Sequence, residues 1–242
     1  MKDAVLVLGG AFNPVHTQHV ALLCLCKQQL EARGRWNVIG GYFAVATDNY
    51  VLHKLRSRGE RTIKLQHRLA LVKEAIRDVP WLAHSPFQDE MLQQHDGSAS
   101  ALGQRLKWLM KNDRVQLLIV IGGDRMVKKG TPIWRKSTAP SSTIRVGVGR
   151  ALNEKVDLLD LWQADLANGL VVNQNEFILL NSSVGPVSSS LVRQHLHEWF
   201  LARGDASKQH VIETDLITRQ SYIHSSTMNY IKQHQDDLFA DA

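Results

Sequence analysis

Apolar residues along this chain gather in two kinds of segment. Short runs rich in aliphatic and β-branched residues predict buried strands, at residues 4–8, 38–45, 81–87, 115–121, 143–148 and 176–180. Between these runs, apolar residues recur at helical spacing and predict helices, at residues 16–32, 64–78, 101–111, 188–202 and 225–237. Strands that alternate with helices indicate a parallel sheet covered on both faces. The pattern therefore predicts an α/β fold with a Rossmann-like, open parallel sheet.

Three polar, turn-rich stretches are predicted as loops: residues 48–61, 88–100 and 124–142. Each begins where a predicted strand ends, or shortly after. The ligand crevice of an open α/β sheet lies beyond the carboxyl ends of its strands. We therefore expect these loops to surround a ligand site. Because no repeat and no Pro/Gly/Ser-rich linker divides the chain, we predict one domain over residues 1–242.

The composition supports a folded protein with an anionic ligand. Of the 242 residues 44% are apolar, enough for a continuous core, and the net charge of +6 favours anions. The basic residues are dispersed and do not alternate with aromatic residues, so we expect small phosphorylated ligands rather than nucleic acid. The two cysteines, Cys24 and Cys26, are interpreted as buried or half-buried thiols.

The lengths of the apolar runs also indicate whether the chain could span a membrane. The longest, at residues 4–8 and 117–121, are far shorter than the roughly 18 residues of a membrane span. The N-terminal run is also too short for a secretory signal. We therefore predict no membrane partner and a cytoplasmic protein, with the nucleus as an alternative.

The segment from Gly9 to His19, with the sequence GGAFNPVHTQH, is the most informative part of the chain. It follows the first predicted strand and opens the first predicted helix. Gly9 and Gly10 let the backbone approach a ligand, and the helix N-terminus offers N–H groups to an anion. His16 and His19, one turn apart, can share a face. Helix capping and a metal pair are alternatives, but no nearby Cys, Asp or Glu completes a zinc site.

This segment resembles the GSFNPxHxGH signature of the nicotinamide and nicotinate mononucleotide adenylyltransferases, in the (T/H)xGH nucleotidyltransferase superfamily. Further matches cover nearly the whole chain. Residues 122–124 (GGD) are similar to the family's G(A)D, residues 131–134 (TPIW) to its loop tryptophan, residues 187–193 (VSSSLVR) to ISSTxxR, and residues 230–234 to its closing helix. Gln18 stands where the signature has glycine, and Lys54 aligns with a family lysine only through a small insertion.

The resemblance implies an activity. The enzyme would condense ATP with nicotinamide or nicotinic acid mononucleotide, giving NAD or deamido-NAD and pyrophosphate in NAD biosynthesis. Mg²⁺ would arrive with ATP, and a homo-oligomer is plausible for this family. Such a transfer depends on positioning and charge neutralisation rather than on a covalent nucleophile. Two alternatives remain: a related adenylyltransferase with another acceptor, and a family-like ATP-binding or ATPase protein that acts in protein quality control.

The resemblance also implies roles for individual residues. The catalytic residues would be His16, His19 and Arg193, which would stabilise the developing charge on the triphosphate. ATP would contact Gly10, His19, Gly122, Asp124, Ser189, Ser190 and Arg193. The pyridine mononucleotide would contact Gly10, Ala11, Phe12, Lys54, Trp81 and Trp134, with the two tryptophans as candidates for stacking on the pyridine ring. No metal site made of protein side chains is expected.

Overall fold

The computed structural model describes residues 1–56, 59–84, 106, 114–128, 130–136, 143–150, 157–185 and 187–240. Its main sheet has six strands in the order β3-β2-β1-β4-β7-β8. These strands are β1 (Lys2–Gly10), β2 (Trp36–Val45), β3 (Leu82–His84), β4 (Gln116–Gly122), β7 (Ile144–Arg150) and β8 (Phe177–Val184). The pairs β1–β4, β4–β7 and β7–β8 are parallel. This doubly wound order confirms the prediction of a Rossmann-like parallel sheet.

The chain forms two compact units, each built from three separate segments. The first unit comprises Met1–Gly9, Ala21–Tyr42 and Ala99–Pro186, and the second comprises Gly10–Val20, Phe43–Ser98 and Val187–Ala242. The single domain predicted for residues 1–242 stays a prediction.

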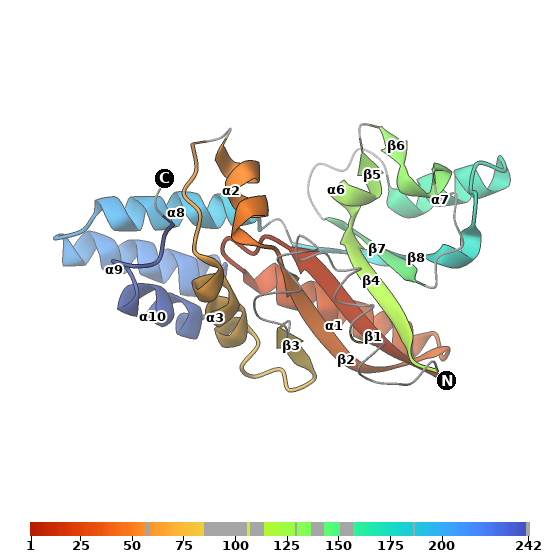
Figure 1. Ribbon diagram of the computed structural model, residues 1–242, viewed down its shortest axis with the longest axis horizontal. Coiled ribbons are helices and arrows are strands. Elements are labelled where there is room, and N and C mark those ends of the chain that lie inside the picture. Colours follow the sequence, from red (N-terminus) through yellow and green to blue (C-terminus); the bar gives the residue numbers. More distant parts are fainter. Residues whose placement is uncertain are drawn as a thin grey trace. The chain divides into compact units, whose positions relative to one another are not determined.

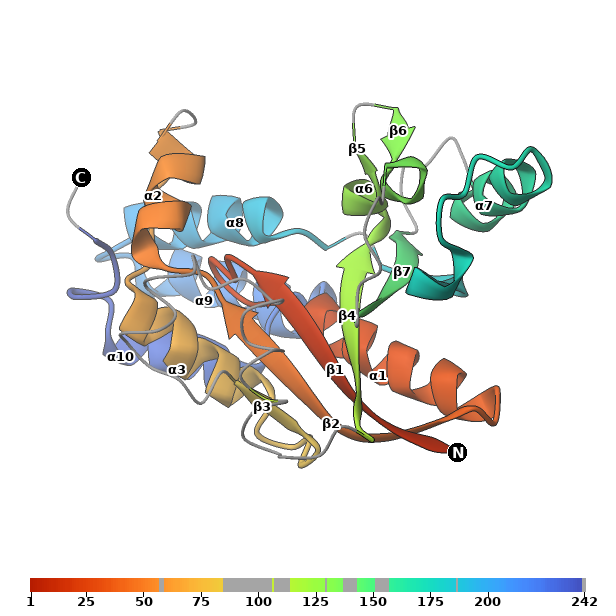
Figure 2. The ribbon, with the colours of Figure 1, turned by 45° about the vertical axis from the view of Figure 1, so that its right-hand side comes forward.

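The first unit contains the buried centre of the sheet. Leu6 lies opposite Leu118 in the β1–β4 register, and both are fully buried. Figure 2 shows β1 and β4 running side by side. Strands covered on both faces have continuous apolar runs, which is why these strands were recognisable in the sequence. The unit also holds most of the long helix and several short elements: α1 (Thr17–Ala32), α6 (Gly123–Met126), β5 (Val127–Lys128), β6 (Thr131–Pro132), η1 (Ile133–Arg135), α7 (Leu158–Ala167) and η2 (Gln174–Glu176).

The second unit is mainly helical. Its elements are α2 (Asp48–Arg56), α3 (Leu65–Ala75), β3, α8 (Ser189–Leu201), α9 (Ala206–Thr214), the π-helix η3 (Asp215–Arg219) and α10 (Ser225–Gln233). Helix α8 packs against α9 and α3 packs against α10 (Figure 1). Two of the helices begin at side-chain caps: the Ser188 Oγ accepts from the Leu191 N–H (3.2 Å), and the Asp205 carboxylate accepts from the Lys208 N–H (3.0 Å).

Several predicted elements need correction. Residues 48–61 are not all loop, because Asp48–Arg56 form α2, whose Val51 and Leu55 are buried four residues apart. The predicted loop at 124–142 contains α6, η1 and the antiparallel pair β5–β6. Helices α7 and α9 were not predicted. The predicted loop at 88–100 and helix at 101–111 lie outside the described residues, except for Leu106, which is helical and buried.

The burial of the two cysteines agrees with their interpretation as packed thiols. Cys26 is buried and Cys24 is half-buried, and burial raises the pKa of both thiols. In the part of the chain that the structure describes, no helix has the length and apolar character needed to cross a membrane.

Candidate active site

The loop between β1 and α1 is built around the ring of Phe12. This side chain is 2% exposed and contacts the edges of His19 and Phe43, with ring centroids 4.9 and 5.1 Å apart. A Cβ at Gly10 would lie 3.0 Å from the Phe12 ring, so glycine is needed here for the ring to fold over the backbone. Phe12 itself has a φ of 45°, a conformation rare for a bulky residue and typical of a constrained functional loop.

The two histidines of the motif stack on each other. Their ring centroids are 3.6 Å apart with an interplanar angle of 28°. His16 is buried and His19 is half-buried. The His16 backbone N–H donates to the His19 Nδ1 (3.2 Å), so the neutral His19 ring carries its proton on Nε2. His19 therefore presents a hydrogen-bond donor on the nitrogen opposite the backbone contact, as a phosphate ligand requires.

The start of α8 is tied directly to the histidine loop. Ser189 Oγ donates to the Pro14 carbonyl (2.9 Å), and Arg193 Nη1 donates to the Asn13 carbonyl (2.7 Å). Arg193 Nη2 donates to Ser190 Oγ (2.9 Å). The structure therefore brings His16, His19, Ser189, Ser190 and Arg193 together in the second unit, although 175 residues separate Pro14 from Ser189 in the sequence.

Asn13 and Arg68 form a scaffold beneath this loop that the sequence did not reveal. The Asn13 side chain, 1% exposed, donates to the Arg61 carbonyl (3.1 Å) and accepts from the Ile63 N–H (2.7 Å). The fully buried Arg68 donates to the carbonyls of Ile63, Ala11 and Ala46 (2.9, 2.9 and 2.6 Å) and to the Asp48 carboxylate (2.7 Å). Burial lowers the pKa of Arg68 and the Asp48 contact opposes this. The sequence did contain one signal for this scaffold, because Arg68 lies on the apolar side of the helix predicted at residues 64–78.

Two cavities of the second unit meet at one segment. The first has a volume of 740 Å³, and its wall includes Ile63, Ser190, Leu191, Arg193, His197 and Phe239. The second has a volume of 660 Å³, and its wall includes Leu52, Arg56, Thr62 and Ala240. Gly59, Glu60 and Arg61 line both. The carboxylate of Glu60 forms an ion pair with Arg193.

A family model matches most of this chain. The model of the family described as cytidylyltransferase-like matches residues 7–195. This chain belongs to the cytidylyltransferase-like family. The match confirms the resemblance to the nucleotidyltransferase superfamily.

Two curated relatives and two solved structures resemble this family member. The chain is 23% identical to a nicotinamide/nicotinic acid mononucleotide adenylyltransferase of Arabidopsis thaliana over 241 residues, 96% of this chain and 88% of the relative. It is also 23% identical to nicotinamide/nicotinic acid mononucleotide adenylyltransferase 2 of Bos taurus, over 57% of this chain and 44% of that protein. Two structures of Plasmodium falciparum nicotinic acid mononucleotide adenylyltransferase, complexed with APC and with NaAD, share the fold at 15% identity. Their TM-scores are 0.54 and 0.56, and the matches cover 98% and 97% of this chain and 97% of each solved chain.

In the first unit of this cytidylyltransferase-like chain, the Gly-Gly-Asp segment lies where the sequence placed it. Gly122 ends β4 and forms the N-cap of α6, Gly123 is buried, and Asp124 is the second residue of α6. These positions follow a central strand directly. The contacts with ATP predicted for Gly122 and Asp124 stay predictions.

Trp134 is a predicted site residue whose surroundings differ from the expected polar loop, and its contact with the pyridine ring stays a prediction. It does not stand in a polar loop: its side chain is 0% exposed, and its Nε1 donates to the Asp165 carboxylate (2.7 Å). Trp162 and Phe177 pack edge-on against it. The cause is α7, the unpredicted helix that supplies Trp162 and Asp165. Stacking of Trp134 on a pyridine ring would require this cluster to open.

The other pyridine-site candidates lie in the second unit. Trp81 is half-buried in the turn before β3, and Lys54 is exposed on α2. Their roles stay predictions. Among the described residues, no group of three or more His, Cys, Asp or Glu side chains could hold a metal ion.

The nine histidines outside the motif lie in different surroundings. His67 is a packing residue: it is buried, and its ring nitrogens contact the Tyr230 hydroxyl (2.9 Å) and the Asp237 carbonyl (3.1 Å). His53, His197, His210 and His224 are exposed, His84, His195 and His234 are half-buried, and His95 lies outside the described residues.

Proposed function

We propose that the protein is an adenylyltransferase of NAD biosynthesis. It would condense ATP with nicotinamide or nicotinic acid mononucleotide and release pyrophosphate. The observation that carries this proposal is the joining of the two motif segments, through the hydrogen bonds from Ser189 to Pro14 and from Arg193 to Asn13. The adenylyltransferase of Arabidopsis thaliana, matched over 96% of this chain, supports the same substrate class.

The residues of the second unit suit the charge changes of adenylyl transfer. Attack by the phosphate of the mononucleotide on the α-phosphorus of ATP forms one P–O bond and breaks the bond to pyrophosphate. A phosphate monoester has a second pKa of about 6 and is mostly dianionic at neutral pH, so the reaction needs no general base. The Nε2–H of His19 would donate to the triphosphate, with the buried His16 behind it orienting the ring.

The start of α8 would hold the leaving group. Ser189, Ser190 and the N–H groups of the first turn offer hydrogen bonds, and Arg193 offers a charge that neutralises pyrophosphate as it departs. Mg²⁺ would enter as part of the MgATP substrate. Gly122 and Asp124 would contact the nucleoside of ATP. The pyridine mononucleotide would be bound by Gly10, Ala11, Phe12, Lys54, Trp81 and, if its cluster opens, Trp134.

An acceptor screen tests the proposal. Pyrophosphate release from MgATP is measured with nicotinamide mononucleotide, nicotinic acid mononucleotide and 4′-phosphopantetheine as separate acceptors, and each product is identified by mass. We expect release only with a pyridine mononucleotide. Release only with 4′-phosphopantetheine would support a related adenylyltransferase. ATP binding without transfer to any acceptor would overturn the proposal and favour the quality-control alternative.

A further inference from the structure

The ion pair between Glu60 and Arg193 lies in the wall between the two cavities of the second unit. Both side chains are largely covered: 29% of Glu60 and 13% of Arg193 is exposed. Glu60 is the only acidic residue among the described residues that line either cavity, whereas Arg56, Arg61 and Arg193 all do. One carboxylate thus stands among three guanidinium groups.

Glu60 occupies the position that a phosphate oxygen would take on Arg193. The Arg193 guanidinium donates to the Asn13 carbonyl through Nη1, and to Ser190 Oγ and the Glu60 carboxylate through Nη2. Carboxylate and phosphate oxygens accept from a guanidinium with the same fork geometry. An anionic ligand that uses Arg193 must therefore compete with Glu60.

The backbone on one side of Glu60 is firmly held. Ile63 pairs with Phe239 in a β-bridge, the Ala240 N–H donates to the Thr62 carbonyl (2.8 Å), and the Asn13 side chain contacts both Arg61 and Ile63. Gly59, on the other side, has a φ of +62°, a conformation that glycine adopts without strain. The Glu60 side chain can thus leave Arg193 by rotating about its own bonds while residues 61–64 stay in place.

We propose that Glu60 is a displaceable counter-ion of the polyphosphate site. A phosphate group of the ligand takes its place on Arg193, and the freed carboxylate moves into one of the two adjoining cavities. The cost of breaking the ion pair falls only on ligands that reach Arg193. Glu60 thereby lowers the affinity for ligands that place a phosphate group on Arg193, and it leaves the affinity for ligands that do not reach Arg193 unchanged. The identity of the ligand as ATP rests on the proposed function, but the displacement itself does not.

Binding of inorganic tripolyphosphate, ATP and adenosine, measured by calorimetry without an acceptor, tests this role. Glu60→Gln keeps the size of the side chain and removes its charge. A partly exposed ion pair is worth up to about 1 kcal/mol, so the Kd for tripolyphosphate and for ATP should fall about 3- to 5-fold in this variant. The Kd for adenosine should not change.

Two matched variants separate displacement from a general charge effect. Glu213→Gln removes a carboxylate that is paired with Lys232 in the same unit, and it should leave all three Kd values unchanged. In an Arg193→Met background, Glu60→Gln should no longer tighten tripolyphosphate binding. If Glu60→Gln does not fold, Glu60→Asp, with a shorter reach to Arg193, should tighten binding by a smaller factor.

The outcomes also separate this proposal from the proposed function. Tighter tripolyphosphate binding that depends on Arg193 supports the displaceable counter-ion, even if no dinucleotide is ever made. Unchanged or weaker binding in Glu60→Gln, or the same gain in Glu213→Gln or in the Arg193→Met background, overturns it, even if the enzyme makes NAD.

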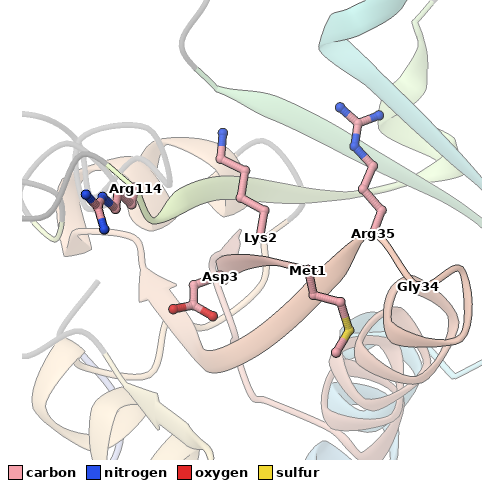
Figure 3. A pocket seen from close by; sticks show the side chains of 6 residues that line it. All are labelled: Met1, Lys2, Asp3, Gly34, Arg35 and Arg114. Carbon is pink, nitrogen blue, oxygen red and sulfur yellow. The ribbon is translucent and has the colours of Figure 1, made fainter.

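A third cavity, in the first unit, does not support a comparable proposal. It has a volume of 490 Å³ and is lined by Met1, Lys2, Asp3, Gly34, Arg35 and Arg114. Figure 3 shows the charged ends of its three basic side chains well apart, so they do not converge on one ligand.

Discussion

Two networks of arginine and aspartate, one in each unit, use the same pair of charges in opposite ways. In the second unit the arginine is in the interior: the Arg68 side chain is 0% exposed and its partner Asp48 is 38% exposed. In the first unit the carboxylate is in the interior: Asp165 is 3% exposed and Arg135 is 35% exposed. A guanidinium has five donors and no acceptor, whereas a carboxylate only accepts.

This inversion decides what each network holds in place. The buried arginine collects backbone carbonyls, at Ala11, Ala46 and Ile63, and so joins three loops around the histidine motif. The buried carboxylate collects side-chain N–H groups, from Trp134 and Arg135, and so anchors an aromatic cluster. We therefore expect loss of Arg68 to disturb the candidate active site and loss of Asp165 to act on the stability of the first unit.

The largest effect is expected from Arg68→Met. The substitution leaves three buried carbonyls without a donor and should cost about 3–5 kcal/mol of unfolding free energy. Urea unfolding followed by circular dichroism measures this loss. Arg68→Lys keeps the charge but offers fewer hydrogen-bond donors. Its unfolding free energy should lie between those of Arg68→Met and the native protein. A loss below about 1 kcal/mol for Arg68→Met would show that the loops do not depend on this side chain.

The second largest effect is expected from Asp165→Ala, which should lose about 2–3 kcal/mol of unfolding free energy. It leaves the buried Trp134 Nε1 without an acceptor, while Arg135 can turn to solvent. The matched control is Asp236→Ala, whose ion pair with Arg203 is exposed and should contribute less than about 1 kcal/mol. Equal losses in the two variants, measured by the same urea titration, would contradict the importance of burial.

Acid should weaken the network of the first unit, because it protonates the Asp165 carboxylate. The hydrogen bonds from Arg135 hold the pKa of this carboxyl below its usual range, with a further contribution from Trp134. A lowered folded-state pKa stabilises the protein fully above the unfolded value of about 4, and this stability is lost as pH falls through the folded value. The unfolding free energy of Asp165→Asn should therefore fall less steeply below about pH 4 than that of the native protein. If the unfolding free energies of Asp165→Asn and the native protein depended on pH in the same way, the role of Asp165 would be refuted.

The smallest effects concern one glycine in each unit. A Cβ at Gly10 would meet the Phe12 ring at 3.0 Å, and that ring is confined by Phe43 and His19. A Cβ at Gly147 would meet the Met126 Cε at 2.7 Å, the free end of a flexible side chain. Gly10→Ala should cost about 1 kcal/mol and raise the KM for substrates, whereas Gly147→Ala should cost less. A larger loss of thermal stability in Gly147→Ala than in Gly10→Ala would contradict the packing of the Phe12 loop.

The sheet could be predicted because its strands are buried on both faces and read as continuous apolar runs. Helix α2 could not be predicted, because only two of its nine residues, Val51 and Leu55, are buried, and two positions do not make a visible apolar pattern. Trp134 falls in the predicted loop at residues 124–142, but it is buried because α7, a helix that was not predicted, packs against it.

The motif segments that the structure brings together could be recognised in the sequence, but the residues that support them could not. His16, His19 and Arg193 belong to short signatures of the sequence, and their roles stay predictions. Arg68, Asn13 and Glu60 act through contacts with segments up to 180 residues away, and no spacing in the sequence encodes these contacts.

Transfer of the α-phosphate of ATP into a dinucleotide tests the central claim most directly. The native protein and His19→Ala are incubated with MgATP labelled at the α-phosphate and with either pyridine mononucleotide. The native protein should place the label in NAD or deamido-NAD. His19→Ala should unfold at the same urea concentration and transfer about 10²- to 10³-fold more slowly. Absence of labelled dinucleotide with the native protein, or equal transfer by the folded variant, would contradict the account.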